Sequence, residues 1–82
     1  NIYPIPFDDQ FRIDLNLSGT AKDLTIGMYN VTGEKVADLY SGNVSSTLFS
    51  QIWQAPPSLR SGVYLVKINY GGQELVRRVV KL

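Results

Sequence analysis

Hydrophobic and polar residues alternate along most of the chain with a period of two. In the stretch QFRIDLNL, Phe11, Ile13, Leu15 and Leu17 share one face, and the residues between them are polar or charged. Such alternation is typical of a β-strand with one face packed on a core, and no stretch holds a 3.6-residue period over three turns. The pattern therefore predicts an all-β chain. Strands are expected at residues 10–17, 23–29, 35–40, 47–53, 63–70 and 73–82, with a short edge strand within residues 2–6.

Glycine and proline mark the turns between these strands. Gly33 stands where a hairpin loop needs a positive φ, so the third and fourth strands are expected to form a hairpin. Gly71 and Gly72 suit a two-residue type I′ turn between the last two strands. Pro56 and Pro57 exclude sheet pairing from the segment APPSLRSG, and the polar segment SGNVSS is expected to be a loop.

Seven short antiparallel strands in a chain of 82 residues indicate an immunoglobulin-like β-sandwich of two sheets. A single open sheet would leave one apolar face in water. Leu59, Gly62 and Tyr64 resemble a tyrosine corner, in which the phenol hydroxyl bonds a backbone group a few residues upstream. Trp53 and Tyr64 are expected to anchor the core.

The composition removes most enzyme classes. The chain has no Cys and no His, so thiolate nucleophiles, imidazole bases and the ligands that transition metals prefer are all missing. We therefore expect no catalytic activity, no metal and no cofactor. Because the chain starts at Asn1 without a signal peptide, residues 1–82 are expected to be one domain excised from a longer protein.

Charge is distributed unevenly between the two halves. Residues 1–40 carry six acids and three bases, and residues 41–82 carry one acid and five bases, which gives net charges of −3 and +4. The imbalance is either a chance feature of a solvated surface or a basic docking face built from the C-terminal strands. The bases are too sparse for nucleic acid, which is therefore not expected as a partner.

Three other signals allow a chemical interpretation. Asp8 and Asp9 lack the ligand spacing of a calcium loop, so they are expected to be solvated turn residues. Glycosylation sequons at Asn16, Asn30 and Asn43 are triplets that short polar loops produce readily. Exposed aromatic residues could instead form a sugar-stacking platform. Its candidate members are Tyr3, Tyr29, Tyr40, Trp53 and Tyr70.

Four motifs in order resemble a known family. The opening YPIPFDDQFRIDL, the central LTIGMYNVTGEKV, the later LRSGVYLVKI and the closing GGQELVRRVVKL together resemble the type A C-terminal sorting domain of the type IX secretion system. The resemblance covers essentially the whole chain. The family's opening is usually Pro-Asn-Pro, and Ile5 here replaces the Asn. The matching positions are Pro4, Pro6 and Phe7, then Gly33 and Val36, then Gly62 and Tyr64, and finally Arg77, Arg78 and Lys81 in the basic ending.

The resemblance implies a targeting module without activity of its own, at the end of a secreted protein of a Bacteroidota-type bacterium. An N-terminal cargo would enter the periplasm and pass the outer membrane through the type IX translocon, aided by an outer-membrane shuttle protein. A surface signal peptidase would usually remove the domain by cutting before Asn1. The cargo would then stay on the cell surface or reach the medium.

The closing strand is the candidate for recognition, since it is patterned as a strand to the last residue whereas chain ends usually fray. As an exposed edge it could receive an added strand from the translocon, with its bases steering the encounter. The alternative role of the bases is to keep an edge strand from aggregating, and edge pairing between two copies is a further expectation. The recognition residues named by this hypothesis are Glu74, Val76, Arg77, Arg78, Val79, Val80, Lys81 and Leu82.

A second function class stays open at this point. The chain could be a non-catalytic immunoglobulin-like or fibronectin-like module that binds polysaccharide, or a spacer, attached to an extracellular enzyme. Position separates the two, because a sorting domain must be the last domain of its precursor, whereas a binding module tolerates an internal position.

Overall fold

The computed structural model describes residues 1–17 and 22–82, and seven β-strands make up most of this part of the chain. No helix occurs among the described residues, so none is long and apolar enough to cross a membrane. The strands are β1 (Ile2–Tyr3), β2 (Gln10–Asn16), β3 (Lys22–Asn30), β4 (Lys35–Val44), β5 (Leu48–Gln54), β6 (Gly62–Tyr70) and β7 (Gln73–Lys81).

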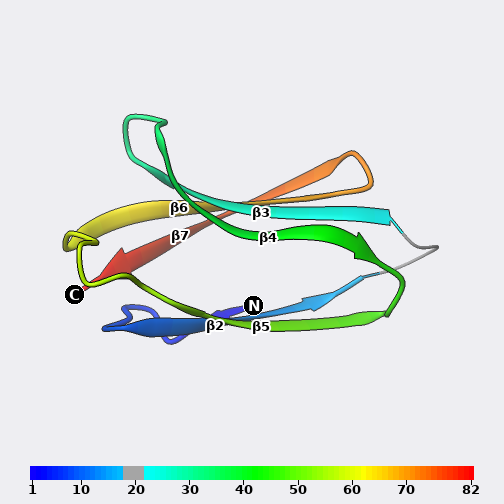
Figure 1. The fold of residues 1–82 in the computed structure, drawn as a ribbon, viewed down its shortest axis with the longest axis horizontal. Helices are drawn as coiled ribbons and strands as arrows, with labels where there is room; N and C mark the ends of the chain where they lie inside the picture. The colour runs from blue at the N-terminus through cyan, green and yellow to red at the C-terminus, as the bar shows by residue number, and fades with distance from the viewer. Residues whose placement is uncertain (18–21) are drawn as a thin grey trace.

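The strands form two antiparallel sheets that stack face to face (Figure 1). One sheet has the order β1-β2-β5 and the other β4-β3-β6-β7. Every pairing between named strands is antiparallel. The prediction of an immunoglobulin-like sandwich of about seven strands is confirmed, and the proline-containing opening forms an edge strand as expected.

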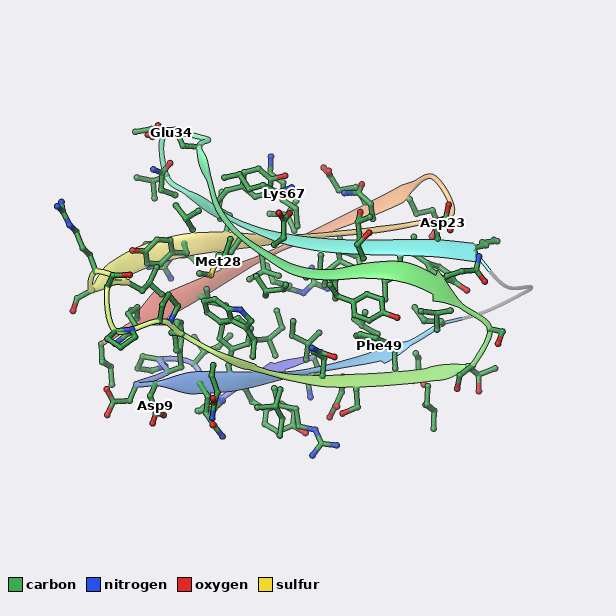
Figure 2. The ribbon with its side chains drawn as sticks, in the orientation of Figure 1. Asp9, Asp23, Met28, Glu34, Phe49 and Lys67 are labelled. Carbon is green, nitrogen blue, oxygen red and sulfur yellow. The ribbon has the colours of Figure 1, made fainter. Side chains whose placement is uncertain are left out.

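The core lies between the two sheets and consists mainly of the residues that alternate inward along β2, β3 and β6. Figure 2 shows Met28 and Phe49 pointing between the layers, whereas Asp9 and Lys67 point to the outside. Phe7 and Phe11 are fully buried and meet edge to face, with ring centroids 4.9 Å apart. The buried hydrophobic residues are Ile2, Phe7, Phe11, Ile13, Leu15, Leu24, Ile26, Met28, Leu39, Val44, Tyr64, Val66, Ile68 and Val79.

The two expected core anchors differ in burial. Tyr64 is buried, and its hydroxyl donates a hydrogen bond to the Arg60 carbonyl at 2.7 Å, so the tyrosine corner is present. Trp53 is only half-buried, although its ring lies 5.3 Å from that of Phe11. The reason is its position on β5, which is an edge strand that no other described strand pairs with on its outer side. The fully buried aromatic anchors are Phe7 and Phe11.

The turn glycines have the conformations that their positions require. Gly71 and Gly72 have φ of +56° and +84°, as in a type I′ turn, and join β6 to β7 in register from Tyr70 to Gln73. Gly33 also has a positive φ, of +93°, in the β3–β4 hairpin, and so does Gly62 at the start of β6.

The β3–β4 hairpin departs from the expected pattern in two ways. Residues 41–44, expected to be loop, continue β4 to Val44, which pairs with Lys22. The β3–β4 register shifts between Met28 and Tyr29, which leaves Val36 without a partner opposite it, and its side chain is 41% exposed. The Gly33 and Val36 motif is therefore a turn followed by an exposed bulge residue, because the bulge turns that side chain away from the core.

Candidate functional site

The candidate site is β7, which lies at the free edge of the four-stranded sheet. Pairing with β6 covers one side of β7 from Gln73 to Lys81. On the other side no named strand pairs with it within the described part of the chain. An edge of this kind carries backbone groups that another strand can bind.

Alternate residues of β7 direct their backbone groups outward. The two-residue hairpin makes Tyr70 and Gln73 a hydrogen-bonded pair, so every second residue from Gln73 bonds to β6. The residues between them have their N–H and C=O groups on the free edge. These edge residues are Glu74, Val76, Arg78 and Val80, followed by Leu82.

The C-terminal end of this edge is already occupied. Phe7 forms an isolated parallel bridge with Lys81. The Phe7 amide donates to the Val80 carbonyl at 2.9 Å, and the Leu82 amide donates to the Phe7 carbonyl at 2.9 Å. We call these two bonds the Phe7 clamp. The clamp explains why the strand continues to Lys81, and it leaves the edge from Glu74 to Arg78 without a partner strand within the described chain.

Side chains of β7 alternate between the two faces of the sheet. Glu74, Val76, Arg78 and Val80 lie on the outer face, opposite Asn69, Lys67, Leu65 and Val63 of β6. Val76 is 40% exposed, and Glu74 and Arg78 are exposed as well. The outer face of β7 thus offers one acid, one apolar residue and one base along the unpaired edge.

The inner face of β7 changes character along its length. Val79 is fully buried opposite Tyr64, so it is a core residue that holds the strand in place. Leu75 and Arg77 lie on the same inner face but are exposed. The Arg77 guanidinium donates to the Val76 carbonyl at 3.0 Å, on the free edge. Arg77 and Arg78 therefore carry positive charge on opposite faces of one strand.

The basic residues of the C-terminal half lie mainly on β6 and β7. Lys81 is half-buried and its Nζ donates to the Leu82 carbonyl at 2.7 Å. Lys67 lies over the ring of Tyr29, with Nζ 4.5 Å from the centroid. Among the described residues, Arg77, Arg78 and Lys81 make no ion pair with an acid. Arg77 and Arg78 are exposed, whereas the Lys81 ammonium is bonded within the chain.

A separate polar cluster lies on the outer face of the three-stranded sheet. The Asp14 carboxylate accepts hydrogen bonds from the Tyr3 hydroxyl, from the Ser50 hydroxyl at 2.7 Å and from Arg12 Nε at 2.9 Å. Tyr3 first, then Ser50 and Arg12, lower the pKa of Asp14 to about 2. The cluster has no second acid, and it ties β1, β2 and β5 together.

The other chemical signals of the sequence do not converge. Asp8 and Asp9 are exposed, and the described residues contain no group of three acids that could hold a metal ion. Tyr3 lies on the outer face of one sheet and Tyr29 on that of the other. The remaining platform candidates, Tyr40, Trp53 and Tyr70, pack against the core. The aromatic residues do not form a single stacking surface.

Sequence reasoning missed the role of Phe7. The residue follows Pro4 and Pro6, which interrupt pairing after β1, and it then meets the far end of the chain. A large apolar residue directly after a proline-interrupted edge strand was the available signal. Its partner could not be found from spacing, because the two segments are separated by almost the whole chain.

One comparison with known proteins identifies a family. The family described as "Secretion system C-terminal sorting domain" matches residues 1–82, which is the whole chain. No curated protein and no solved structure matches it. Proteins with such a domain are exported by the type IX system, and the domain interacts with that machinery and is attached to an N-terminal cargo. The chain therefore belongs to the type IX secretion C-terminal sorting domains, which direct export to the cell surface or the extracellular space.

Proposed function

We propose that residues 1–82 are the last domain of a secreted precursor and that the translocon, or its outer-membrane shuttle protein, binds the unpaired edge of β7. The recognition residues are Glu74, Val76, Arg77 and Arg78, and Val79, Val80, Lys81 and Leu82 hold the strand in position. The domain acts as an export signal and catalyses no reaction. A surface signal peptidase then cuts before Asn1 and releases the cargo.

One observation carries this proposal: the unpaired part of β7 is held at both ends. The type I′ turn fixes one end, and the Phe7 clamp with buried Val79 fixes the other. A preorganised edge costs less conformational entropy when a partner strand adds to it. The bases on the two faces of β7 would speed the encounter with an acidic partner more than they raise affinity.

Truncation of the last nine residues is a poor test of this proposal. It removes Val79 from the core and deletes all of β7 except Gln73, so a loss of export would follow from unfolding alone. A substitution that changes only the free edge is sharper.

The sharper variant is Val76→Pro. The Val76 amide points to the free edge, so proline removes an edge donor and leaves the β6 ladder intact. Ile52→Pro is the matched control on β5. Ile52 is an exposed apolar residue. Thr47 and Ala55 bond to Leu17 and Asp9 on the β2 side, so the odd-numbered residues of β5 face β2. Because backbone groups alternate along a strand, the Ile52 amide points to the free edge.

Each variant would be fused behind a fluorescent reporter with a periplasmic signal peptide, in a host with a type IX system and in a translocon-null strain. We expect the unmodified domain and Ile52→Pro to export the reporter in the competent host only, and Val76→Pro to leave it in the periplasm. Circular dichroism of both variants must show a folded domain. Export of folded Val76→Pro at the unmodified level would contradict edge recognition.

The two arginines separate steering from protection against aggregation. If they steer the encounter, Arg77→Gln and Arg78→Gln together should slow export while the domain stays monomeric. If they only keep β7 edges apart, export should persist and size-exclusion chromatography should show dimers or larger species.

A further inference from the structure

An apolar groove opens between the two sheets beside the start of β7. It has a volume of about 100 Å³, well above the roughly 10 to 15 Å³ that a cavity needs to hold one water. Leu75, on its rim, is 46% exposed. The groove exists because β1 has only two residues, so the sheet beneath β7 ends early. The residues that line it are Leu15, Asn16, Leu17, Ile68, Tyr70, Gln73 and Leu75.

Asn1 continues the pairing of β1 with β2 up to Asp14, next to the residues of β2 that line this groove. Ile2 pairs with Ile13, and the pairing continues one step further: the Asp14 amide donates to the Asn1 carbonyl at 2.8 Å, and the Asn1 nitrogen donates to the Asp14 carbonyl at 2.7 Å. Asn1 and Asp14 thus form a hydrogen-bonded pair of an antiparallel ladder. Continuing that ladder would place the next upstream residues opposite Leu15, Asn16 and Leu17.

On its β1 side, β2 has backbone groups that a continued strand could bond. The Leu17 amide donates to the Thr47 carbonyl on the β5 side at 2.7 Å. Backbone groups alternate along a strand, so the Asn16 amide and carbonyl point to the β1 side. Within the described chain no hydrogen bond of the Asn16 amide is present on that side. In Figure 1 the N-terminus lies partway along the lower layer, with β2 continuing beyond it.

We propose that the polypeptide linking the cargo to Asn1 extends β1 by at least three residues along β2 and closes this groove. The proposal rests on the proposed function, which places a cargo before Asn1. Residues opposite each other in an antiparallel pair share a face. The first and third residues before Asn1 therefore face inward with Leu15 and Leu17 and take apolar side chains, and the second faces outward and bonds to Asn16.

This extension has a consequence for the sorting domain itself. The linker becomes part of the three-stranded sheet and covers Leu75, so the domain is more stable while the cargo is attached than after its release. Gln73 and Leu75 at the start of β7 line the groove together with Leu15 and Leu17, so cargo attachment orders the surroundings of the candidate recognition edge.

The test compares the chain starting at Asn1 with the same chain preceded by the eight residues that its own precursor places there. Amide hydrogen exchange by NMR reports the Asn16 amide directly. We expect its exchange to slow about tenfold or more with the native segment, because it gains a backbone partner. The Leu17 amide, already paired with Thr47, serves as the internal reference. Unchanged exchange of Asn16 would overturn the proposal.

A second pair of chains tests the register. One carries threonine-valine-threonine-valine before Asn1, which puts valine at the first and third upstream positions, and the other carries valine-threonine-valine-threonine. The two have the same composition and opposite register. The first should melt several degrees higher than the second, and equal melting temperatures would contradict closure of the groove. Neither measurement involves export, so its failure would leave the proposed function untouched, and failure of export would leave this result standing.

Discussion

At the scale of single residues, Tyr64 and Asp14 each have polar atoms with a defined hydrogen-bond partner that stabilises the fold. Tyr64 combines a buried ring with a hydroxyl bonded to the Arg60 carbonyl, four residues upstream. This pairing is local in sequence, so the spacing of Gly62 and Tyr64 was enough to predict it. Asp14 bonds to Arg12 two residues away, but it also bonds to Tyr3 of β1 and Ser50 of β5, and no local pattern points to these two.

Tyr64→Phe should lower the free energy of unfolding by about 1 kcal/mol, one net hydrogen bond, out of a total of roughly 4 to 12 kcal/mol for a domain of this size. The melting temperature should fall by about 4 to 8 °C. Tyr29→Phe is the control, because the Tyr29 hydroxyl makes no hydrogen bond within the described chain. Equal melting curves for the wild type and Tyr64→Phe would show that the corner adds nothing to stability.

Asp14 predicts a pH dependence of stability. Its pKa is about 2 in the folded domain against 3.8 for the free side chain, so the unfolded state binds the proton more readily. The stabilisation is then fully present above about pH 4 and is lost as the pH falls through 2. Asp14→Asn should be less stable than the wild type at pH 7 and should lose less stability between pH 5 and pH 2. Asp8→Asn, at an exposed carboxylate without a hydrogen bond in the described chain, should follow the wild-type curve in chemical denaturation.

At the scale of elements, period-two alternation placed every long strand to within a few residues, because each strand buries one face. The end of β4 was missed, since Ser41, Gly42 and Asn43 have low strand propensity. Pairing with Thr25, Leu24 and Asp23 of β3 holds them in the sheet. Burial of β7 was also unpredictable from its own sequence, because the length of the opposite sheet decides which of its residues are covered.

The β6–β7 hairpin gives an element-scale prediction. Gly71 has a φ of +56°, a conformation that costs an alanine roughly 1 kcal/mol and that asparagine tolerates at this position of a type I′ turn. Gly71→Ala should therefore destabilise the domain by about 1 kcal/mol, and Gly71→Asn by much less. Urea denaturation of the two variants measures the difference. If both lose the same amount, crowding against the Lys22 side chain rather than the turn conformation sets the cost.

At the scale of the whole molecule, the first and last segments of the chain determine how β7 is displayed. The resemblance of four ordered motifs indicated a sorting domain, and the alternation predicted the last strand. Neither shows how much of that strand lacks a partner, because this length is set by the pairing of Phe7 with Lys81. Phe7 belongs both to the core, against Phe11, and to the clamp on Val80 and Leu82. Packing in the N-terminal segment is thus coupled to order at the C-terminus.

Phe7→Leu tests this coupling. The smaller side chain keeps the site apolar and should cost about 1 to 2 kcal/mol, so the domain stays folded. Loss of the ring contact with Phe11 should loosen the clamp, and the Leu82 amide should exchange faster with solvent by a larger factor than the Leu17 amide, which is bonded elsewhere. Ile13→Val, a similar loss of packing in the core away from Phe7, is the control and should leave the Leu82 amide relatively unchanged.

If β7 must be presented as an ordered edge, export of a reporter should fall for Phe7→Leu and not for Ile13→Val at equal stability. Equal export by both variants would mean that the translocon reads β7 without needing its C-terminal end to be fixed.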